Sequence, residues 1–293
     1  MRSLHHVAEI GAFCAVTVVN SVRSRARNAS RQGEPCSMYV RHRLVHTTTV
    51  NPGRIPFMLA HPTLEKLNAM RLTGMAQAFE EQLQLDNIEA LSAEERIALM
   101  IDREMTEREA RRLTNRLRRA RLRHPEACIE DIDYRHPRRL DRALMTKLAT
   151  SQWLREHLNV LICGPTGIGK SWLSCALANK ACRDGFSALY IRVPRFVREL
   201  IRAKGDGSYP KLLVSLAKTD LLVLDDFGAG TLNDEHRHDL LEILEDRYAV
   251  RSTLVTSQYP VNDWHEVIGD PTLADAILDR LVHNAYKLEL NGK

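Results

Sequence analysis

The sequence predicts a three-layer α/β fold built on a parallel sheet, preceded by a small all-α region. From residue 158 onward, short apolar runs alternate with segments of helical periodicity, and this alternation requires crossovers between parallel strands. Residues 63–123 show helical periodicity alone. We therefore divide the chain into an extension (1–57), a helical, arginine-rich N-terminal domain (58–139) and an α/β domain (140–293).

The first 57 residues lack the patterns of a folded domain. Residues 7–19 are apolar, but basic residues follow them instead of preceding them, which is the wrong order for a secretory signal. Residues 21–56 mix Arg, Thr, Pro and Gly without sustained periodicity, so we expect disorder. Met58 opens a sequence that behaves like a conventional start. Our hypothesis is that the natural protein begins there and that the extension has no function.

Residues 63–123 are expected to form helices that end in a strongly basic stretch. Pro62 lies just inside the first helix, residues 86–89 are a break, and Ser92 and Glu95 form a capping box for the next helix. The second half of that helix has no acidic residue beyond Glu109. Such a stretch is either a solvated face or, as we favour, a surface that contacts the phosphates of duplex DNA without reading bases. The candidate contacts are Arg111, Arg112, Arg116, Arg118, Arg119 and Arg123.

One glycine-rich segment predicts the ligand. The apolar residues 158–163 lead into Gly-x-x-x-x-Gly-Lys-Ser, the phosphate-binding P-loop pattern, and residues 172–183 are expected to be the helix that follows. The glycines let backbone N–H groups point at phosphate oxygens, and the helix N-terminus adds its dipole. Lys170 would reach the β- and γ-phosphates of ATP, and Ser171 would hold Mg²⁺. The loop residues predicted to bind ATP are Gly164, Pro165, Thr166, Gly167, Ile168, Gly169, Lys170 and Ser171.

A second apolar run ends in two aspartates. Residues 221–224 look like a strand buried on both faces of a parallel sheet. Asp225 is placed to complete the nucleotide site by holding Mg²⁺, and Asp226 to polarise the attacking water. In a P-loop kinase the acid would instead bind an acceptor. The paired acids, without an evident acceptor pocket, favour hydrolysis of ATP to ADP and phosphate.

Composition limits the class of protein and its cellular compartment. Apolar residues make up 44% of the 293, which is ample for a core, and the net charge of +5 is mild, so the clustering of arginine matters more than the total. The six cysteines form no Cys-x-x-Cys pair and no metal spacing, which fits a reducing cytosol, and Cys163, Cys175 and Cys182 are expected in the core. No apolar stretch reaches the roughly 18 residues of a membrane span. We expect a cytoplasmic protein without a membrane partner.

The α/β part is expected to contain further regular elements. Periodicity predicts strands at residues 188–193, 221–226, 252–258 and 286–290. It predicts helices at residues 140–156, 194–203, 209–218, 234–248 and 275–284.

From Met58 onward the chain resembles the IstB-type helper ATPases of bacterial insertion sequences, a branch of the AAA+ class close to the DnaC helicase loader. Besides the P-loop, the segments that carry this resemblance are His61-Pro-Thr-Leu-Glu-Lys-Leu, Arg71-Leu-Thr-Gly-Met75, Leu224-Asp-Asp-Phe-Gly228, Thr256-Ser-Gln258 and Asp275-Ala-Ile-Leu-Asp-Arg-Leu281. The combination is far more specific than a P-loop alone.

The resemblance implies an AAA+ fold, homo-oligomers that form with ATP on duplex DNA, and a transposase as partner. It implies that Thr256, Ser257 and Gln258 sense the γ-phosphate or the catalytic water. It also implies that Arg280 is an arginine finger that reaches the ATP of a neighbouring subunit. The alternative for Arg280 is a pairing with Asp275, Asp279 or solvent.

The resemblance ends at the last strand. Family members usually continue with a basic tail that carries a second sensor arginine, whereas this chain stops at Asn291-Gly-Lys293, so either the tail is truncated or that sensor is missing. Two other functions stay open: a DnaC-like helicase loader, or a nucleotide-gated DNA-binding module without efficient turnover. A degenerate pseudogene product is a third possibility.

Overall fold

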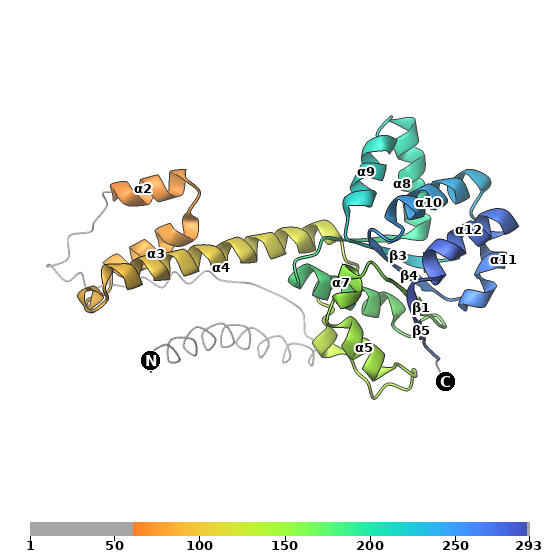
Figure 1. The fold of residues 1–293 in the computed structure, drawn as a ribbon, viewed down its shortest axis with the longest axis horizontal. Coiled ribbons are helices and arrows are strands. Elements are labelled where there is room, and N and C mark those ends of the chain that lie inside the picture. The colour runs from red at the N-terminus through yellow and green to blue at the C-terminus, as the bar shows by residue number, and fades with distance from the viewer. Residues whose placement is uncertain (1–60, 292–293) are drawn as a thin grey trace, which may run out of the picture. The chain divides into compact units, whose positions relative to one another are not determined.

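Five parallel strands form a single sheet in the computed structural model, which describes residues 61–291 (Figure 1). The predictions for residues 1–57 and for a start at Met58 lie outside the described residues. The strand order is β2-β3-β4-β1-β5, and every pairing is parallel. All carboxyl ends therefore lie at one edge of the sheet. The strands are β1 (Asn159–Cys163), β2 (Ala188–Arg192), β3 (Leu221–Phe227), β4 (Ser252–Ser257) and β5 (Ala285–Glu289).

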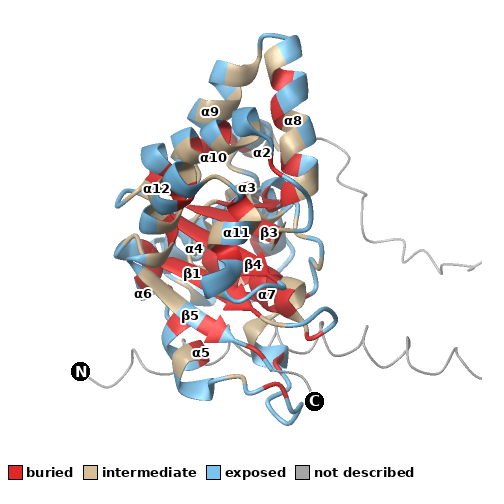
Figure 2. Cartoon of the chain, turned by 90° about the vertical axis from the view of Figure 1, so that its right-hand side faces the viewer, coloured by how far each residue is buried: buried red, intermediate tan, exposed pale blue. Residues whose placement is uncertain are grey.

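Helices cover both faces of the sheet, as the three-layer prediction requires. Alternate residues of β1 belong to different apolar clusters: Val160 and Ile162 join one, and Leu161 and Cys163 join the other. The first cluster includes α7 (Lys170–Arg183). The second includes α8 (Val193–Gly205), α9 (Tyr209–Lys218), α10 (Asp234–Arg247), α11 (Trp264–Ile268) and α12 (Pro271–Val282). The central strands are buried on both sides (Figure 2).

The N-terminal part of the described chain is helical, as expected. Its helices are α2 (Pro62–Ala69), α3 (Thr73–Leu83) and α4 (Ala93–Ala120), with a short 3₁₀ turn, η1 (Ile88–Ala90), at the expected break. The capping box is confirmed: Ser92 N donates to Glu95 Oε2 at 2.8 Å, and Glu95 N donates to Ser92 Oγ at 3.2 Å. Whether residues 58–139 fold as a separate domain stays a prediction.

A buried carboxylate joins α3 to α4. Glu104 Oε2 accepts hydrogen bonds from Gly74 N at 2.7 Å and Met75 N at 3.2 Å, and so satisfies N–H groups in the first turn of α3. A Cβ at Gly74 would lie 2.7 Å from Glu104 Cα, so only glycine lets the helices approach this closely. Burial raises the pKa of Glu104, but the bonds from Arg108, Met75 and Gly74 outweigh it and the pKa is lowered.

The end of α4 is attached to the α/β part. Leu113 and Leu117 pack against the apolar cluster that contains α7. Arg116 Nε donates to Cys182 O at 2.8 Å, near the end of α7. Part of the basic stretch of α4 therefore contacts the rest of the molecule instead of solvent.

The prediction of a single helix over residues 140–156 is wrong. The chain forms α5 (Arg142–Leu148) and α6 (Gln152–Arg155), separated by Ser151, whose φ of 55° is left-handed. The break lets the Trp153 indole turn inward, where its Nε1 donates to Leu148 O at 3.0 Å. Burial of this large side chain is therefore favoured over helix continuity.

Other boundaries differ by a few residues. Helix α7 begins at Lys170, two residues before the expected start, because the loop passes directly into the helix. Helix α12 begins at Pro271, four residues early, where the Asp270 side chain caps it by accepting from Leu273 N at 2.8 Å. Cys163, Cys175 and Cys182 are buried as expected. Between residues 61 and 291, no helix combines the length and apolar character needed to cross a bilayer.

Candidate nucleotide-binding and hydrolysis site

The P-loop joins the carboxyl end of β1 to the N-terminus of α7. Gly164, Gly167 and Gly169 have φ values of 149°, 85° and 98°, which L-residues with side chains rarely adopt. At Gly164 a Cβ would lie 2.3 Å from Leu290 O, and at Gly169 it would lie 2.7 Å from Arg138 Nη1. All three glycines are thus favoured by their backbone conformation, and Gly164 is also required by a close backbone neighbour.

Arg138 supports this loop from outside it. The residue is 8% exposed, and its Nη1 donates to Ile168 O at 3.3 Å while its Nη2 donates to Asp133 O at 3.3 Å. Its Nε is buried without a hydrogen-bond partner. A buried guanidinium without a carboxylate is costly, so its place against the phosphate loop indicates a role there.

Lys170 lies within the curve of the loop. Its Nζ donates to Gly164 O at 2.7 Å and Pro165 O at 3.0 Å. Burial lowers the pKa of Lys170, although the nearby Asp226 and Asp225 act in the opposite direction. The ammonium group is therefore held at the loop by carbonyl oxygens that the phosphates of a nucleotide would replace.

Asp225 is the fully buried centre of the site. Its carboxylate accepts from Ser171 Oγ at 2.9 and 3.0 Å, from Thr256 Oγ1 at 2.6 Å, and from the Tyr190 hydroxyl. Burial and the bond to Asp225 raise the pKa of Tyr190, so the phenol stays protonated and keeps donating. Strands β2, β3 and β4 thus hold one carboxylate beside the P-loop serine.

Asp226 points away from this centre. It lies at a bulge where the register between β3 and β4 shifts, and its φ is 60°. A bulge turns a side chain to a new direction. The Asp226 carboxylate pairs with Arg192, with Oδ2 at 2.8 Å from Nε and 2.7 Å from Nη2.

These groups line a cavity of about 500 Å³, which we call the nucleotide cavity. Its walls include Lys170, Ser171 and Asp226, and also Arg123 and Gln258. Asp225 lies behind Ser171. The two predicted motifs therefore meet at one site, at the carboxyl edge of the sheet where α/β folds bind ligands.

The donor set suits magnesium. Ser171 Oγ and the Asp225 carboxylate are hard oxygen ligands, the type that Mg²⁺ prefers, and both oxygens of Asp225 already face Ser171. Bound there, the ion would neutralise charge on the nucleotide phosphates.

Ser257 and its neighbour Gln258 differ in their access to the nucleotide cavity. Ser257 is fully buried, and its Oγ donates to Phe227 O at 2.8 Å and accepts from Tyr259 N at 3.1 Å. Gln258 is exposed at the cavity, where its Oε1 accepts from Thr166 Oγ1 at 3.3 Å. Of the residues 256–258, Gln258 is the one placed to contact a phosphate or water.

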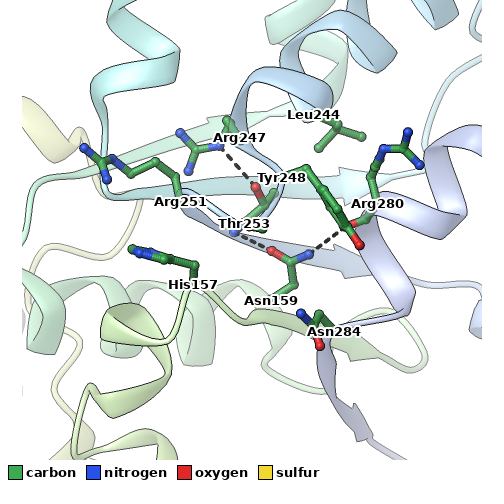
Figure 3. Close-up of a pocket in the computed structure, with 10 residues that line it drawn as sticks. His157, Asn159, Leu244, Arg247, Tyr248, Arg251, Thr253, Arg280 and Asn284 are labelled. Carbon is green, nitrogen blue, oxygen red and sulfur yellow. Dashed lines mark hydrogen bonds between the residues drawn. The ribbon is translucent and has the colours of Figure 1, made fainter.

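Arg280 lies with Asn159 and Thr253 around a small pocket at the amino ends of β1 and β4, whereas the P-loop follows the carboxyl end of β1 (Figure 3). Asn159, the first residue of β1, donates from Nδ2 to Arg280 O at 2.9 Å, whereas the P-loop follows the last residue of β1. The five residues of β1 between these two ends span about 13 Å. The guanidinium pairs with Glu245 through Nε at 2.7 Å and Nη2 at 2.9 Å, and with Asp279 through Nη1 at 2.5 Å. Pairing with Asp279 was the predicted alternative, while Glu245 was not anticipated.

The six arginines predicted to contact DNA do not form one uniform surface. Arg112, Arg118 and Arg119 are exposed on α4. Arg111 is also exposed and lies 3.8 Å from Glu104 Oε1. Arg116 is bound to Cys182 O, and Arg123 lines the nucleotide cavity.

Sequence reasoning missed several residues of the site. Tyr190 and Arg192 on β2 and the connector residue Arg138 received no role, although each contacts a motif residue. No local signal marks them. The end of β2 was detectable as a place to search, because it lies beside β3 in a parallel sheet.

The fold and the site together define a P-loop protein built on a parallel α/β sheet. The chain belongs to the IstB-like ATP binding proteins, whose family model matches residues 65–293. It is 57% identical over 236 residues to "Putative insertion sequence ATP-binding protein y4pL" of Sinorhizobium fredii, covering 80% of this chain and 96% of that one.

Other similar proteins carry related descriptions. The chain is 47% identical to "Insertion sequence IS1162 putative ATP-binding protein" of Pseudomonas fluorescens, over 69% of this chain and 88% of that one. Among solved structures it is similar to the DnaC helicase loader, with 19% identity, a TM-score of 0.47, and coverage of 56% of this chain and 97% of that one.

Proposed function

We propose that the chain hydrolyses ATP with Mg²⁺ while assembled on duplex DNA, as the helper of an insertion-sequence transposase. The observation that carries the proposal is the convergence of Lys170, Ser171 with Asp225, and Asp226 on one cavity. The insertion-sequence descriptions of relatives support the transposase as partner.

The residues suggest how hydrolysis proceeds. Lys170 and the loop N–H groups bind the β- and γ-phosphates, and Gln258 contacts the γ-phosphate or the water. Asp226 accepts a proton as the water oxygen attacks the γ-phosphorus. The bond from that phosphorus to the β,γ-bridging oxygen breaks, and ADP and phosphate leave.

Arg280 is proposed to complete the site of a neighbouring subunit. It lies at the other end of β1 from its own P-loop, so its side chain does not reach its own nucleotide. A finger supplied by a neighbour stabilises charge in the transition state and typically contributes about 10³-fold or more in rate. Homo-oligomers are therefore part of the proposed mechanism.

The proposed DNA surface is the exposed basic face of α4. Arg112, Arg118 and Arg119 carry it, while Arg116 is used within the molecule. Arginine without interleaved aromatic residues favours contact with phosphates over base readout.

The test mixes two inactive variants. Lys170→Ala removes the ammonium group that binds the β- and γ-phosphates, and Arg280→Ala removes the proposed finger. Each substitution alone is expected to lower the rate of duplex-stimulated hydrolysis by about 10³-fold. In a mixture, an Arg280→Ala subunit with an intact P-loop receives the finger of a Lys170→Ala neighbour. Phosphate release by the mixture should therefore recover a substantial fraction of the wild-type rate.

The controls separate a finger from a structural arginine. Arg237→Ala changes another paired arginine, on α10, and should keep most of the activity. A mixture that stays inactive would contradict action in trans. ATP binding without turnover by the wild-type chain would leave a nucleotide-gated module and remove the enzymatic part of the proposal.

A further inference from the structure

Arg123 brings a further positive charge to the nucleotide cavity. Among the described residues that line this cavity, the lysine and arginine side chains are Lys170, Arg192 and Arg123, and the only carboxylate is that of Asp226. Lys170 is held by carbonyl oxygens of the loop, and Arg192 is paired with Asp226. Within the described part of the chain, no ion pair engages Arg123, which is exposed. Its guanidinium donors are therefore available to an anion in the cavity.

The chain is held against α7 on both sides of Arg123. The C-cap residue of α4, Arg121, has a left-handed φ of 52°, which ends the helix two residues before Arg123. Leu122 packs against the apolar cluster that contains α7. On the other side, Asn179 of α7 donates from Nδ2 to Pro125 O at 3.3 Å. Arg123 is thus presented to the cavity by a turn that is anchored to the helix following the P-loop.

Tyr190 relates Arg123 to one end of a bound nucleotide. The Arg123 guanidinium is close enough to the Tyr190 hydroxyl to act on its pKa, which it lowers, against the larger effects of burial and of Asp225. The same hydroxyl donates to Asp225, which accepts from Ser171 Oγ. Ser171 and Asp225 would hold Mg²⁺, and in P-loop sites this ion bridges the β- and γ-phosphates. Arg123 therefore lies on the side of the cavity where these phosphates would bind.

The terminal phosphate would meet two carboxylates in this part of the site. Asp225 and Asp226 both lie at the end of β3, and each repels a phosphate group. Arg192 offsets the charge of Asp226, and Mg²⁺ would offset that of Asp225. A guanidinium adds a planar fork of donors that matches two oxygens of one phosphate. Arg123 is the arginine of this cavity that has no carboxylate to satisfy.

We propose that Arg123 binds the γ-phosphate of the nucleotide held by its own subunit, so that the cavity prefers a nucleoside triphosphate to a diphosphate. The proposal rests on the nucleotide site of the proposed function and does not depend on hydrolysis. A phosphate of a DNA backbone has the same chemistry as the γ-phosphate, and separate binding measurements distinguish the two sources.

The nucleotide arm is isothermal titration calorimetry of the full chain with Mg²⁺, comparing a non-hydrolysable ATP analogue with ADP. Arg123→Ala should weaken binding of the analogue roughly tenfold and that of ADP by less than about twofold, because the lost hydrogen bonds involve only the γ-phosphate. Arg123→Lys should recover part of the loss, since an ammonium group keeps the charge without the fork. The matched control is Arg121→Ala, which lies two residues away and outside the lining of the nucleotide cavity. It should leave both affinities close to those of the wild type.

Two results of the calorimetry would overturn the proposal. An equal loss of affinity for the analogue and for ADP would do so, because ADP lacks the phosphate that Arg123 is proposed to bind. Equal effects of Arg123→Ala and Arg121→Ala would reduce the role of Arg123 to general positive charge.

The duplex arm measures fluorescence anisotropy of a labelled duplex with the full chain in the absence of nucleotide. Arg123→Ala should leave the duplex affinity unchanged, whereas Arg119→Ala, on the proposed DNA surface, should weaken it. Weaker duplex binding by Arg123→Ala, together with an unchanged preference for the ATP analogue over ADP, would assign Arg123 to DNA and overturn the proposal. If the wild-type chain binds the analogue but does not hydrolyse ATP, the hydrolytic part of the proposed function fails, while the calorimetry still decides the role of Arg123.

Discussion

Arg138 shows how much one residue contributes to the geometry of the P-loop. Its side chain lies against Gly169 and donates to Ile168 O, and its backbone O accepts from Asn291 N at 3.2 Å. It thereby connects the phosphate loop to the residues after β5. We regard it as a positioning residue, because it touches the loop and not the reacting atoms.

Replacing Arg138 should weaken nucleotide binding more than it changes the chemical step. Loss of its hydrogen bonds costs about 1–3 kcal/mol, so Arg138→Ala should raise KM for ATP by roughly tenfold with a smaller change in kcat. Arg138→Lys should recover part of the effect. The exposed Arg135 provides the control, Arg135→Ala, which should leave KM unchanged. A lower melting temperature with unchanged KM would contradict the assignment.

At the scale of elements, Glu104 makes the contact between α3 and α4 sensitive to acid. Its pKa is lowered from the ordinary 4.5 because Arg108 and the Gly74 and Met75 N–H groups outweigh the effect of burial. A carboxyl group with a lowered pKa stabilises the folded form above its unfolded pKa, and this stabilisation is lost as the pH falls through the folded value.

The hydrogen-exchange protection of α3 should therefore fall as the pH drops below about 4.5, after correction for the intrinsic exchange rate. Glu104→Gln should lower the protection by about 1–3 kcal/mol at neutral pH and remove its dependence on acid. Glu109→Gln, an exposed glutamate on the same helix, is the matched control. Equal pH profiles for the wild type and Glu104→Gln would refute the account.

At the scale of the whole molecule, the separation of Arg280 from its own P-loop favours assembly. If Arg280 is the finger that we propose, it lies at the other end of β1 from its own P-loop, and a chain by itself would hold an incomplete site. Glu245 and Asp279 occupy every nitrogen of the guanidinium in the isolated chain. In the proposed assembly, a neighbour's nucleotide would replace at least one of these contacts.

Light scattering should therefore detect a larger particle with a non-hydrolysable ATP analogue and duplex than with ADP alone. Lys170→Ala should reduce this change, because it weakens the nucleotide that bridges subunits. A constant monomeric mass, together with normal hydrolysis, would exclude a finger in trans.

Local features of the chain were predictable. The capping box at Ser92 and Glu95 depends on four adjacent residues, and the P-loop depends on glycines whose conformation no other residue adopts easily. The parallel sheet followed from the alternation of strands and helices. The helix at residues 140–156 was not predictable, because burial of Trp153 overrode a continuous helical period.

The partners of individual arginines could not be predicted from the sequence. Arg135, Arg138 and Arg139 lie within five residues and look alike, yet Arg138 is buried at the P-loop while the other two are exposed. In the same way, Arg116 binds a carbonyl oxygen and Arg192 binds Asp226. A charged side chain has no periodicity that reveals its partner.

The order of elements and the phosphate loop are thus encoded locally, because spacing and backbone conformation specify them within a short stretch of chain. The partners of the arginines, the burial of Ser257 beside the exposed Gln258 and the pairing of Asp226 were decided by tertiary structure. Each depends on which distant segments the sheet brings to the same edge, and hydrogen bonding across that distance sets the partner.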